Sequence, residues 1–514
     1  MDFNPLLEEF ARVADGGCDA LLINPPYTRR FGGGVVPPIG LCYLAASLRE
    51  AGARPVIVDL APHFPKYDKA EQDLAKEVVR YFLGRFGDKP PLLIGVGPLV
   101  TATLRSTHDI VGICRQETRS LIVTGGPLCS APGISRVSKD YLDVDFFVAG
   151  DGEAPLLSIW HRHIGHGSAC SHSSVGVPGQ IEPCSFREHN LDSLPLPARD
   201  LLSNDFYKCS ARRDLGHVLM TSAFLSRGCP YSCSFCAAPL SSGKAIRRLS
   251  SARVTQEISS CGRAEIGHII FYDDCLFVKA PSLNEHVLNF AESIASANWN
   301  GTFQLELRCD AVTALSDQAL KALTEIGCRQ INMGIEKGQV AALQKLRKRL
   351  SPQTAREACD RLSNLGFRVA GTFIIGGPDE TPEDVEGTID FALSLPLNFA
   401  HFNPMAVYPG TALFEQMFNR NTDWLDLCLD DDLAPCGDIL WRSKEMPLPR
   451  ILEAVEDAYG RFYTRERLGR TLERLPEIER ETVRDSYDVL SNNRAQSWQR
   501  AEVARESAIS NLTC

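Results

Sequence analysis

Three cysteines on one short loop have the spacing to hold an inorganic cofactor. The loop reads Arg-Gly-Cys-Pro-Tyr-Ser-Cys-Ser-Phe-Cys over residues 227–236, which places Cys229, Cys233 and Cys236 in a C-x-x-x-C-x-x-C array. Cysteine thiolates hold iron–sulfur clusters, and four of them are usual for a 4Fe–4S cube. Three protein ligands would leave one iron open. An open iron favours chemistry at the cluster over simple electron storage.

A structural zinc site is the alternative interpretation of the same thiols. Such a site normally takes four protein ligands, often as two paired C-x-x-C knuckles. No second knuckle lies near this loop in the sequence. The missing fourth ligand favours a cluster over zinc.

The loop resembles the cluster loop of radical S-adenosylmethionine (radical SAM) enzymes. In that family an aromatic residue precedes the third cysteine, as Phe235 does here. SAM chelates the fourth iron through its amino and carboxylate groups, and one electron cleaves it to methionine and a 5′-deoxyadenosyl radical. The resemblance therefore implies a 4Fe–4S cluster, SAM, and an electron donor such as flavodoxin or ferredoxin.

Composition limits the class of protein. The chain has 514 residues, of which 44% are hydrophobic and 23% charged, enough for two or three globular domains. Its net charge of −10 argues against a nucleic-acid partner. Residues 1–14 lack the features of a signal peptide, and no apolar stretch is long enough to span a bilayer. Eighteen cysteines without a secretion signal indicate a cytoplasmic protein.

The middle of the chain predicts a partial barrel. Six strand-like runs alternate with helical patterns, and Ser316 and Thr381 are expected helix N-caps. Six β/α units form three-quarters of a TIM-type barrel, whose active site lies at the carboxyl ends of the strands. The predicted strands are 218–225, 268–272, 302–307, 330–334, 368–375 and 401–407, within a (β/α)6 barrel domain over 216–410.

Motifs follow each of these strands, and together they resemble the SAM-contacting loops of the radical SAM family. Lys337 stands where the family usually has Ser, so we expect one polar interaction with SAM to be absent. Arg308 has two open roles, since it could face the SAM carboxylate or pair with Asp310. Each acid could also serve only to complement a helix dipole. The residues that the resemblance assigns to SAM are Phe235, Asp273, Asp274, Arg308, Glu336, Gly376 and Glu380.

The N-terminal part predicts a separate α/β domain over 1–160. Five apolar runs alternate with helical patterns, which indicates a doubly wound, Rossmann-like parallel sheet. Such sheets bind ligands beyond the carboxyl ends of their strands, and glycine-rich loops lie at those positions. No G-x-G-x-x-G fingerprint follows the first strand, so NAD and FAD are disfavoured. The predicted strands are 19–24, 55–60, 92–96, 120–124 and 145–149, and the predicted helices are 41–51 and 103–116.

This domain resembles the cobalamin-binding domain of cobalamin-dependent radical SAM enzymes. An Asn-Pro-Pro strand end, a Pro-Pro-x-Gly-Leu-x-Tyr-Leu-Ala helix start, Gly-Gly-Pro and Gly-x-Gly-Glu occur in the family's order. The loop over residues 35–40 holds no histidine, so cobalamin is expected to bind without a histidine ligand to cobalt. The resemblance assigns cobalamin contacts to Pro38, Gly40, Gly97, Gly125, Gly126, Gly150, Gly152 and Glu153.

Two further segments carry side chains that could bind metal. His161, His163, His166, Cys170 and His172 lie in a linker over 161–215, where a solvated insertion is the favoured interpretation. The C-terminal region 411–514 is expected to be helical at 413–419, 448–469 and 476–489 and to end in a polar tail from residue 491. Cys428, Cys436 and Cys514 could hold a second cluster, but buried or incidental thiols are favoured.

The family resemblance implies one reaction above others. We expect a class B-like, cobalamin-dependent radical SAM methyltransferase that modifies an unactivated carbon of a small biosynthetic intermediate. A non-methylating radical SAM enzyme, catalysing dehydration, hydroxylation, cyclisation or rearrangement, is the alternative. A cobalamin or redox sensor would leave the complete set of SAM-contacting loops unexplained. Catalytic side chains and the identity of the substrate cannot be deduced from the sequence.

Overall fold

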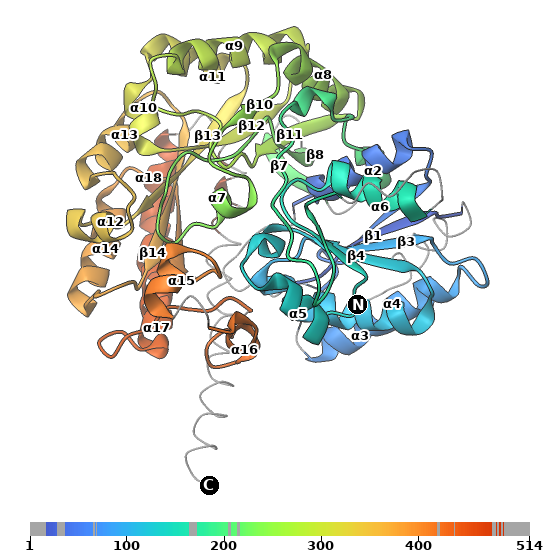
Figure 1. Cartoon of the computed structure of the whole chain (residues 1–514). Coiled ribbons are helices and arrows are strands. Elements are labelled where there is room, and N and C mark those ends of the chain that lie inside the picture. Colours follow the sequence, from blue (N-terminus) through green and yellow to red (C-terminus); the bar gives the residue numbers. More distant parts are fainter. Residues whose placement is uncertain are drawn as a thin grey trace.

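The protein consists of two α/β units, each with its own sheet and core. Figure 1 shows the N-terminal unit in blue beside the second unit, which runs from green to orange. The computed structural model describes residues 17–27, 36–64, 67, 69–163, 172–203, 207–212, 216–418, 422–435, 437–474, 480, 483, 484 and 487. The glycine-rich stretch 30–34 lies outside the described residues, as do His166, Cys170, Cys436 and Cys514.

The N-terminal sheet has the order β2-β1-β3-β4-β5-β6. Its first five strands are parallel, and β6 pairs antiparallel with β5. The chain reverses its direction of winding between β1 and β3, which is where sheets of this order bind ligands. The strands are β1 (Ala20–Asn24), β2 (Pro55–Asp59), β3 (Leu93–Val96), β4 (Leu121–Gly125), β5 (Phe146–Val148) and β6 (Val175–Gly176).

Helices cover both faces of this sheet because alternate strand residues point to opposite sides. Leu22 packs with α2 (Ile39–Glu50) and α6 (Glu153–His163) on one face. Leu21 and Ile23 pack on the other face, against α3 (Lys69–Gly84), α4 (Leu104–Glu117) and α5 (Ile134–Asp140). The expected doubly wound sheet is therefore present, with three helices, α3, α5 and α6, for which the sequence analysis gave no bounds.

The second sheet is a curved, mostly parallel half-barrel with the order β15-β14-β13-β12-β11-β8-β7. Its six parallel strands are those expected, and the added edge strand β7 (Lys208–Arg212) is antiparallel to β8. This arrangement confirms the partial (β/α)6 barrel. The parallel strands are β8 (Gly216–Ala223), β11 (Ile266–Phe271), β12 (Thr302–Leu307), β13 (Cys328–Glu336), β14 (Arg368–Ile375) and β15 (Phe399–Pro404).

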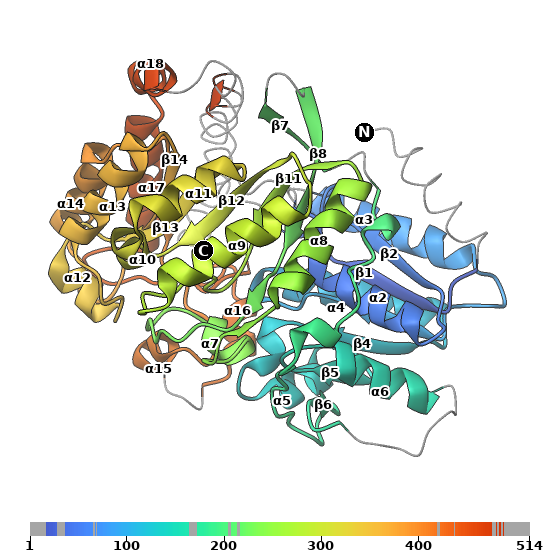
Figure 2. The same ribbon diagram turned by 90° about the horizontal axis from the view of Figure 1, so that it is seen from above.

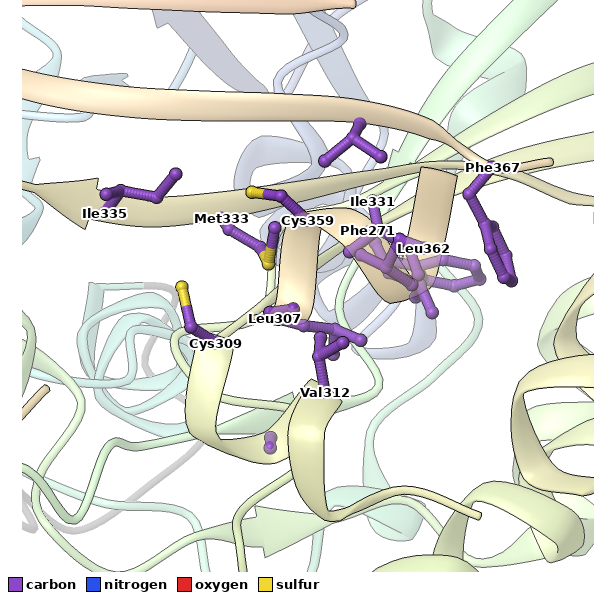
Figure 3. Packing of buried hydrophobic residues seen from close by; sticks show 14 of the residues in the cluster. Phe271, Leu307, Cys309, Val312, Ile331, Met333, Ile335, Cys359, Leu362 and Phe367 are labelled. Atoms are coloured by element: carbon purple, nitrogen blue, oxygen red, sulfur yellow. The ribbon is translucent and has the colours of Figure 1, made fainter. Parts of the chain in front are cut away.

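Amphipathic helices cover the outer face of the half-barrel, as Figure 2 shows. Ser316 and Thr381 cap two of them by accepting hydrogen bonds from Ala319 N and Asp384 N. Figure 3 shows apolar side chains of β12, β13 and α13 that interlock in this core, with the Cys309 and Cys359 thiols buried among them. The helices are α8 (Ser251–Arg263), α9 (Leu283–Ser296), α10 (Cys309–Ala314), α11 (Asp317–Glu325), α12 (Val340–Lys345), α13 (Pro352–Asn364) and α14 (Pro382–Ser394).

The helix expected over 448–469 is wrong as a single element. The chain forms α17 (Leu448–Phe462) and α18 (Arg465–Arg474) with a break between them. At the break, the Tyr463 hydroxyl donates to Ala400 O (2.8 Å) and accepts from Ala400 N (3.0 Å). These hydrogen bonds satisfy the edge of β15, the strand at one end of the sheet. Most of the helix expected over 476–489, and all of the tail from residue 491, lie outside the described residues.

The C-terminal region also returns to the N-terminal unit. It contains α15 (Ala412–Met417) and α16 (Trp424–Leu429). The Trp424 indole donates to Pro132 O (2.7 Å), and Asp423 pairs with Arg136 (2.7 Å). Cys428 is buried in the N-terminal core, as expected for an incidental thiol.

The segment expected to be a solvated insertion is partly structured. Trp160 is buried within α6, and Ser174 is buried beside β6. The prediction failed because the interactions are long-range: Trp160 packs in the core with residues of β1 and β3, and Ser174 O accepts a hydrogen bond from Ala149 N. Within the described stretches, no helix is both long and apolar enough to cross a lipid bilayer.

Candidate active site

Three partly exposed thiols stand out among the cysteines. Of the fourteen cysteines whose side chains are described, ten are buried and Cys184 is exposed, whereas Cys229, Cys233 and Cys236 are intermediate. Across the described residues, no group of three His, Cys, Asp or Glu side chains is placed to hold a single metal ion. Three accessible thiols on one loop fit a cluster that leaves one iron open.

A two-stranded ribbon presents the loop. The strands β9 (Ser226–Arg227) and β10 (Arg247–Arg248) are antiparallel, and residues 228–246 connect them through the short helix α7 (Ala238–Ser241). Gly228 has a φ of +105°, and a Cβ there would lie 2.2 Å from Ala245 O. Only glycine suits this turn, because a side chain would clash with the returning strand.

The three thiols differ in acidity. A hydrogen bond with the Cys275 thiol lowers the pKa of Cys229 to about 7. Burial raises the pKa of Cys236 to about 11 and also raises that of Cys233. Cluster ligands must be deprotonated, so assembly at this loop releases protons.

Two cations lie over the aromatic side chains of the loop. The Arg308 guanidinium lies 3.7 Å from the Tyr231 ring centre, and Lys348 Nζ lies 5.9 Å from that of Phe235. Arg308 also pairs with Asp310 (3.0 Å) and donates to Lys348 O (2.9 Å). The pairing with Asp310 was one of the two roles open for Arg308. Lys348 escaped the sequence prediction because no motif marks it.

The acids expected to contact SAM lie at the carboxyl ends of the barrel strands. Asp273 is buried and accepts hydrogen bonds from Leu225 N and from the Ser226 backbone and hydroxyl. Asp274 is exposed and accepts from Gly228 N (3.0 Å), directly before the first thiol. Asp273 therefore braces the end of β8, whereas Asp274 lies beside the cluster loop.

The acids after β13 and β14 each pair with a buried lysine. Glu336 has a φ of +70° and accepts from Lys348 Nζ (2.7 Å). Glu380 pairs with Lys337, which also donates to Gly376 O (2.9 Å). The lysine that stands in place of the family's usual Ser therefore forms an ion pair within the protein, which the sequence did not predict.

A cavity of about 550 Å³ lies between the two units. The loops after β1, β3, β4 and β5 form one side of it, and the ends of β8 and β11 with the start of the cluster loop form the other. Its wall is mostly apolar, and no histidine belongs to the described lining. The residues assigned to cobalamin all border it: Pro38, Gly40, Gly97, Gly125, Gly126, Gly150, Gly152 and Glu153.

The glycines on this wall do not all have the same role. A Cβ at Gly126 would lie 2.5 Å from Leu99 N, and one at Gly150 would lie 2.2 Å from Phe186 O. A Cβ at Gly40 would meet nothing within 4 Å. Close backbone packing thus accounts for Gly126 and Gly150, while the open space beside Gly40 suits a large flat ligand such as a corrin.

An acid that sequence analysis left without a role faces the inside of the half-barrel. On β12, Leu305 and Leu307 pack in the outer core, so the alternate residue Glu306 points inward. Its side chain is exposed, yet the surrounding protein raises its pKa to about 7. Among the described residues, none donates a hydrogen bond to its carboxylate or forms an ion pair with it. Tyr272, directly after β11, lies near it and lines the cavity between the units.

Comparison with known proteins agrees with this geometry. Residues 224–392 match the family model described as the radical SAM superfamily. An uncharacterized methyltransferase of Pyrococcus horikoshii is 28% identical over 456 residues, which cover 87% of this chain and 92% of that protein. The hopanoid C-3 methylase of Methylococcus capsulatus is 28% identical over 381 residues, covering 73% of this chain and 67% of that enzyme.

A solved structure shares the overall fold. The cobalamin-dependent SAM radical enzyme OxsB, solved with aqua-cobalamin and SAM bound, superposes with a TM-score of 0.65 at 14% identity. The match covers 93% of this chain and 71% of that one, and so includes both α/β units. At this identity the likeness establishes the fold alone.

Proposed function

We propose that the chain, whose residues 224–392 match the radical SAM superfamily model, is a cobalamin-dependent radical SAM methyltransferase acting on an unactivated carbon of a small molecule. The cavity between the two units carries this proposal. It brings the cluster loop and the glycine-rich strand ends of the N-terminal sheet to one space. Two cofactors held on its opposite sides could both reach one substrate.

Different residues would hold each cofactor. Cys229, Cys233 and Cys236 would bind the cluster, whose fourth iron stays available to SAM. The residues that would contact SAM are Phe235 on the cluster loop and six residues at or near the carboxyl ends of β11, β12, β13 and β14: Asp273, Asp274, Arg308, Glu336, Gly376 and Glu380. When bound, the cluster supplies the electron that cleaves SAM to a 5′-deoxyadenosyl radical, and cobalamin supplies the methyl carrier.

The protein side chains orient the reactants and organise the charges around them. Lys348 and Arg308 place positive charge next to the thiolate loop, each held by a carboxylate partner. The apolar wall around Pro37, Ile39 and Leu44 excludes water from the cavity. Without a histidine on the described wall, cobalt would lack a protein imidazole ligand.

The inside of the half-barrel favours a substrate that donates hydrogen bonds. Glu306 presents there a carboxylate that no described residue pairs with, and Tyr272 adds a hydroxyl. Polar side chains alternate with core residues on the neighbouring strand β13, where Gln330 donates to Asn332 Oδ1 (2.8 Å). An unpaired polar group in a binding site discriminates against a ligand that cannot satisfy it. We therefore favour a substrate with an amine or hydroxyl group over a pure hydrocarbon.

We place this activity in a reducing cytoplasm, with a flavodoxin or ferredoxin as electron donor. Two observations support the assignment. The described cysteines are all free thiols, and the cluster loop is partly exposed. A cluster reached by solvent on one side is accessible to a small electron-transfer protein.

Anaerobic purification with cofactor analysis tests the proposal. We expect the full-length protein to contain about four irons per chain and bound cobalamin, and to release 5′-deoxyadenosine from SAM under dithionite. The triple variant Cys229→Ala, Cys233→Ala, Cys236→Ala should lose the cluster absorbance and the deoxyadenosine. Cys184→Ala, which removes an exposed cysteine elsewhere, is the matched control. SAM cleavage by the triple variant, or a wild-type protein that takes up no cobalamin, would contradict the assignment.

A further inference from the structure

A network of four charged side chains connects the cluster loop to the N-terminal unit. Arg227 lies two residues before Cys229 and forms two hydrogen bonds with Glu153, Nη2–Oε1 at 2.6 Å and Nη1–Oε2 at 3.1 Å. Arg227 also lies 3.3 Å from Asp151, and Asp151 pairs in turn with Arg247. Asp151 lies in the loop that follows β5 and Glu153 is the first residue of α6, and both border the cavity.

The two arginines flank the base of the cluster loop. Arg227 on β9 lies directly opposite Arg247 on β10. Residues opposite each other on antiparallel strands share a face, so these two positive charges would repel without a partner. Asp151 contacts both guanidinium groups, Arg227 through Oδ1 and Arg247 through Oδ2. Asp151, which belongs to the N-terminal unit, therefore bridges the two strands at the base of the ribbon that carries the three thiols.

The network of Arg227, Arg247, Asp151 and Glu153 is buried, unlike the ion pair between Arg136 and Asp423. Its four side chains are between 7% and 15% exposed. By contrast, Arg136 and Asp423, which also pair across the units, are 54% and 35% exposed. Buried ion pairs add little net stability, since desolvation offsets their attraction, but they demand one geometry. Fixing a geometry is therefore the better explanation for four charges at this position.

The backbone around the acids leaves little freedom. Asp151 N donates to Phe186 O (3.0 Å), and Asp151 Oδ2 accepts from Glu188 N (2.7 Å). Arg247 also donates to Glu188 O (2.7 Å) and to Ser242 O (2.9 Å). The segment that precedes the barrel thus runs between the acid loop and the cluster loop and is bonded to both.

We propose that Arg227, Arg247, Asp151 and Glu153 are positioning residues that set the separation between the iron–sulfur cluster and cobalamin. The inference rests on the proposed function, because it requires both cofactors in one chain. Arg227 acts through the backbone next to Cys229, and Asp151 and Glu153 act through the loop that borders the cavity. Loss of any member would let the ribbon and the N-terminal loop move relative to each other.

The distance between two paramagnetic cofactors tests this directly. Full-length holoprotein would be prepared anaerobically with a reduced cluster and cob(II)alamin, and the dipolar coupling between their spins measured by pulsed EPR. The variants are Glu153→Gln, Asp151→Asn and Arg227→Gln, with Arg227→Lys as the conservative change. Arg136→Gln removes the exposed pair between the units and is the control. Iron content, cobalamin content and melting temperature report whether each variant is assembled.

We expect a longer and broader distance distribution in the holoprotein of all three neutral variants, with cofactor content unchanged in Asp151→Asn and Arg227→Gln. The shift should be intermediate for Arg227→Lys and absent for Arg136→Gln. Wild-type distances in assembled variants would overturn the inference. A shift in Glu153→Gln alone would also overturn it, since Glu153 would then act by direct contact with cobalamin. A variant could also lose part of its iron and cobalamin while the holoprotein that remains keeps the wild-type distance. The residue would then have a purely structural role, and the inference would be overturned as well. A wild-type protein without a cob(II)alamin signal would refute the proposed function itself.

Discussion

Lys337 and Glu380 form an ion pair whose side chains are only 1% and 4% exposed. Burial lowers the pKa of the lysine, and the Glu380 carboxylate opposes this effect. The pair connects the end of β13 to the loop after β14, where SAM is expected to bind. It forms between residues far apart in the sequence and holds the Gly376 loop through its carbonyl oxygen.

Replacing Lys337 by Met should destabilise the protein strongly. Glu380 would remain as a buried charge without its partner, which typically costs about 3–5 kcal/mol. The double variant Lys337→Met, Glu380→Gln should recover much of this stability. Chemical denaturation measures both, with Lys345→Met as the control, since the neighbouring pair of Lys345 and Asp379 is 44% and 80% exposed. Equal effects of Lys337→Met and Lys345→Met would refute this account.

The hydroxyl of Tyr463 should stabilise the edge of the barrel sheet. In Tyr463→Phe, the buried Ala400 N–H and C=O both lose a partner, at an expected cost of about 1–3 kcal/mol. Tyr459→Phe removes one longer bond, from Phe402 N at 3.3 Å, and should cost less. Thermal and denaturant unfolding compare the two variants. The reverse order of stabilities would contradict the role given to Tyr463.

Two glycines of the cavity should respond differently to alanine. Gly126→Ala places a Cβ against Leu99 at a φ of +136° and should destabilise the protein by about 1–3 kcal/mol, with or without cobalamin. Gly40→Ala has room within α2 and should leave stability unchanged or slightly raised. If Gly40 contacts cobalamin as assigned, its variant should still retain less cobalamin. Full cobalamin content in a stable Gly40→Ala protein would remove Gly40 from the site.

Glu306 should make stability depend on pH. Desolvation by the surrounding protein and the charges of Glu336 and Asp274 raise its pKa from 4.5 to about 7, against the charge of Lys348, which lowers it. The folded protein therefore holds a proton that the unfolded chain releases, so stability falls as the pH rises through this window.

Glu306→Gln should remove this pH dependence in the protein without cofactors. The free energy of unfolding of the variant minus that of wild type should increase from the acid to the neutral end of the window. The increase should be no more than about 1 kcal/mol because solvent reaches the side chain. Glu357→Gln, on the outside of α13, is the control for loss of an acid. Denaturant unfolding at several pH values measures the difference in stability between variant and wild type. A variant that is more stable than wild type only at acid pH would contradict the predicted direction of the effect.

Local patterns predicted the fold well. The bounds of β12 and β14 agree with those expected, because β12 alternates apolar and polar residues and β14 is a mostly buried run of apolar and small residues. Ser316 and Thr381 were found as caps because capping depends on neighbours three residues away. The helix α3 was missed although Ala75, Val78, Val79 and Phe82 recur at helical spacing and are buried. That signal was present in the sequence.

Long-range interactions explain what could not be predicted. Nothing local to Lys337 indicates that its partner is Glu380, and the sequence alone indicated only that a serine hydroxyl is absent there. Arg227 and Glu153 lie in different units, 74 positions apart. The break at Tyr463 depends on a β strand formed much earlier in the chain. These features require knowledge of which strand ends meet, which motifs alone do not supply.

The central claim, that one chain uses both cofactors for methyl transfer, is tested most directly by isotope labelling. Reduced, anaerobic holoprotein would be incubated with SAM that carries a CD3 group, and the nucleosides and the bound corrinoid analysed by mass spectrometry. We predict 5′-deoxyadenosine, S-adenosylhomocysteine and cobalamin that carries the labelled methyl. Deoxyadenosine without label on cobalamin would contradict methyl transfer and favour a non-methylating radical SAM enzyme.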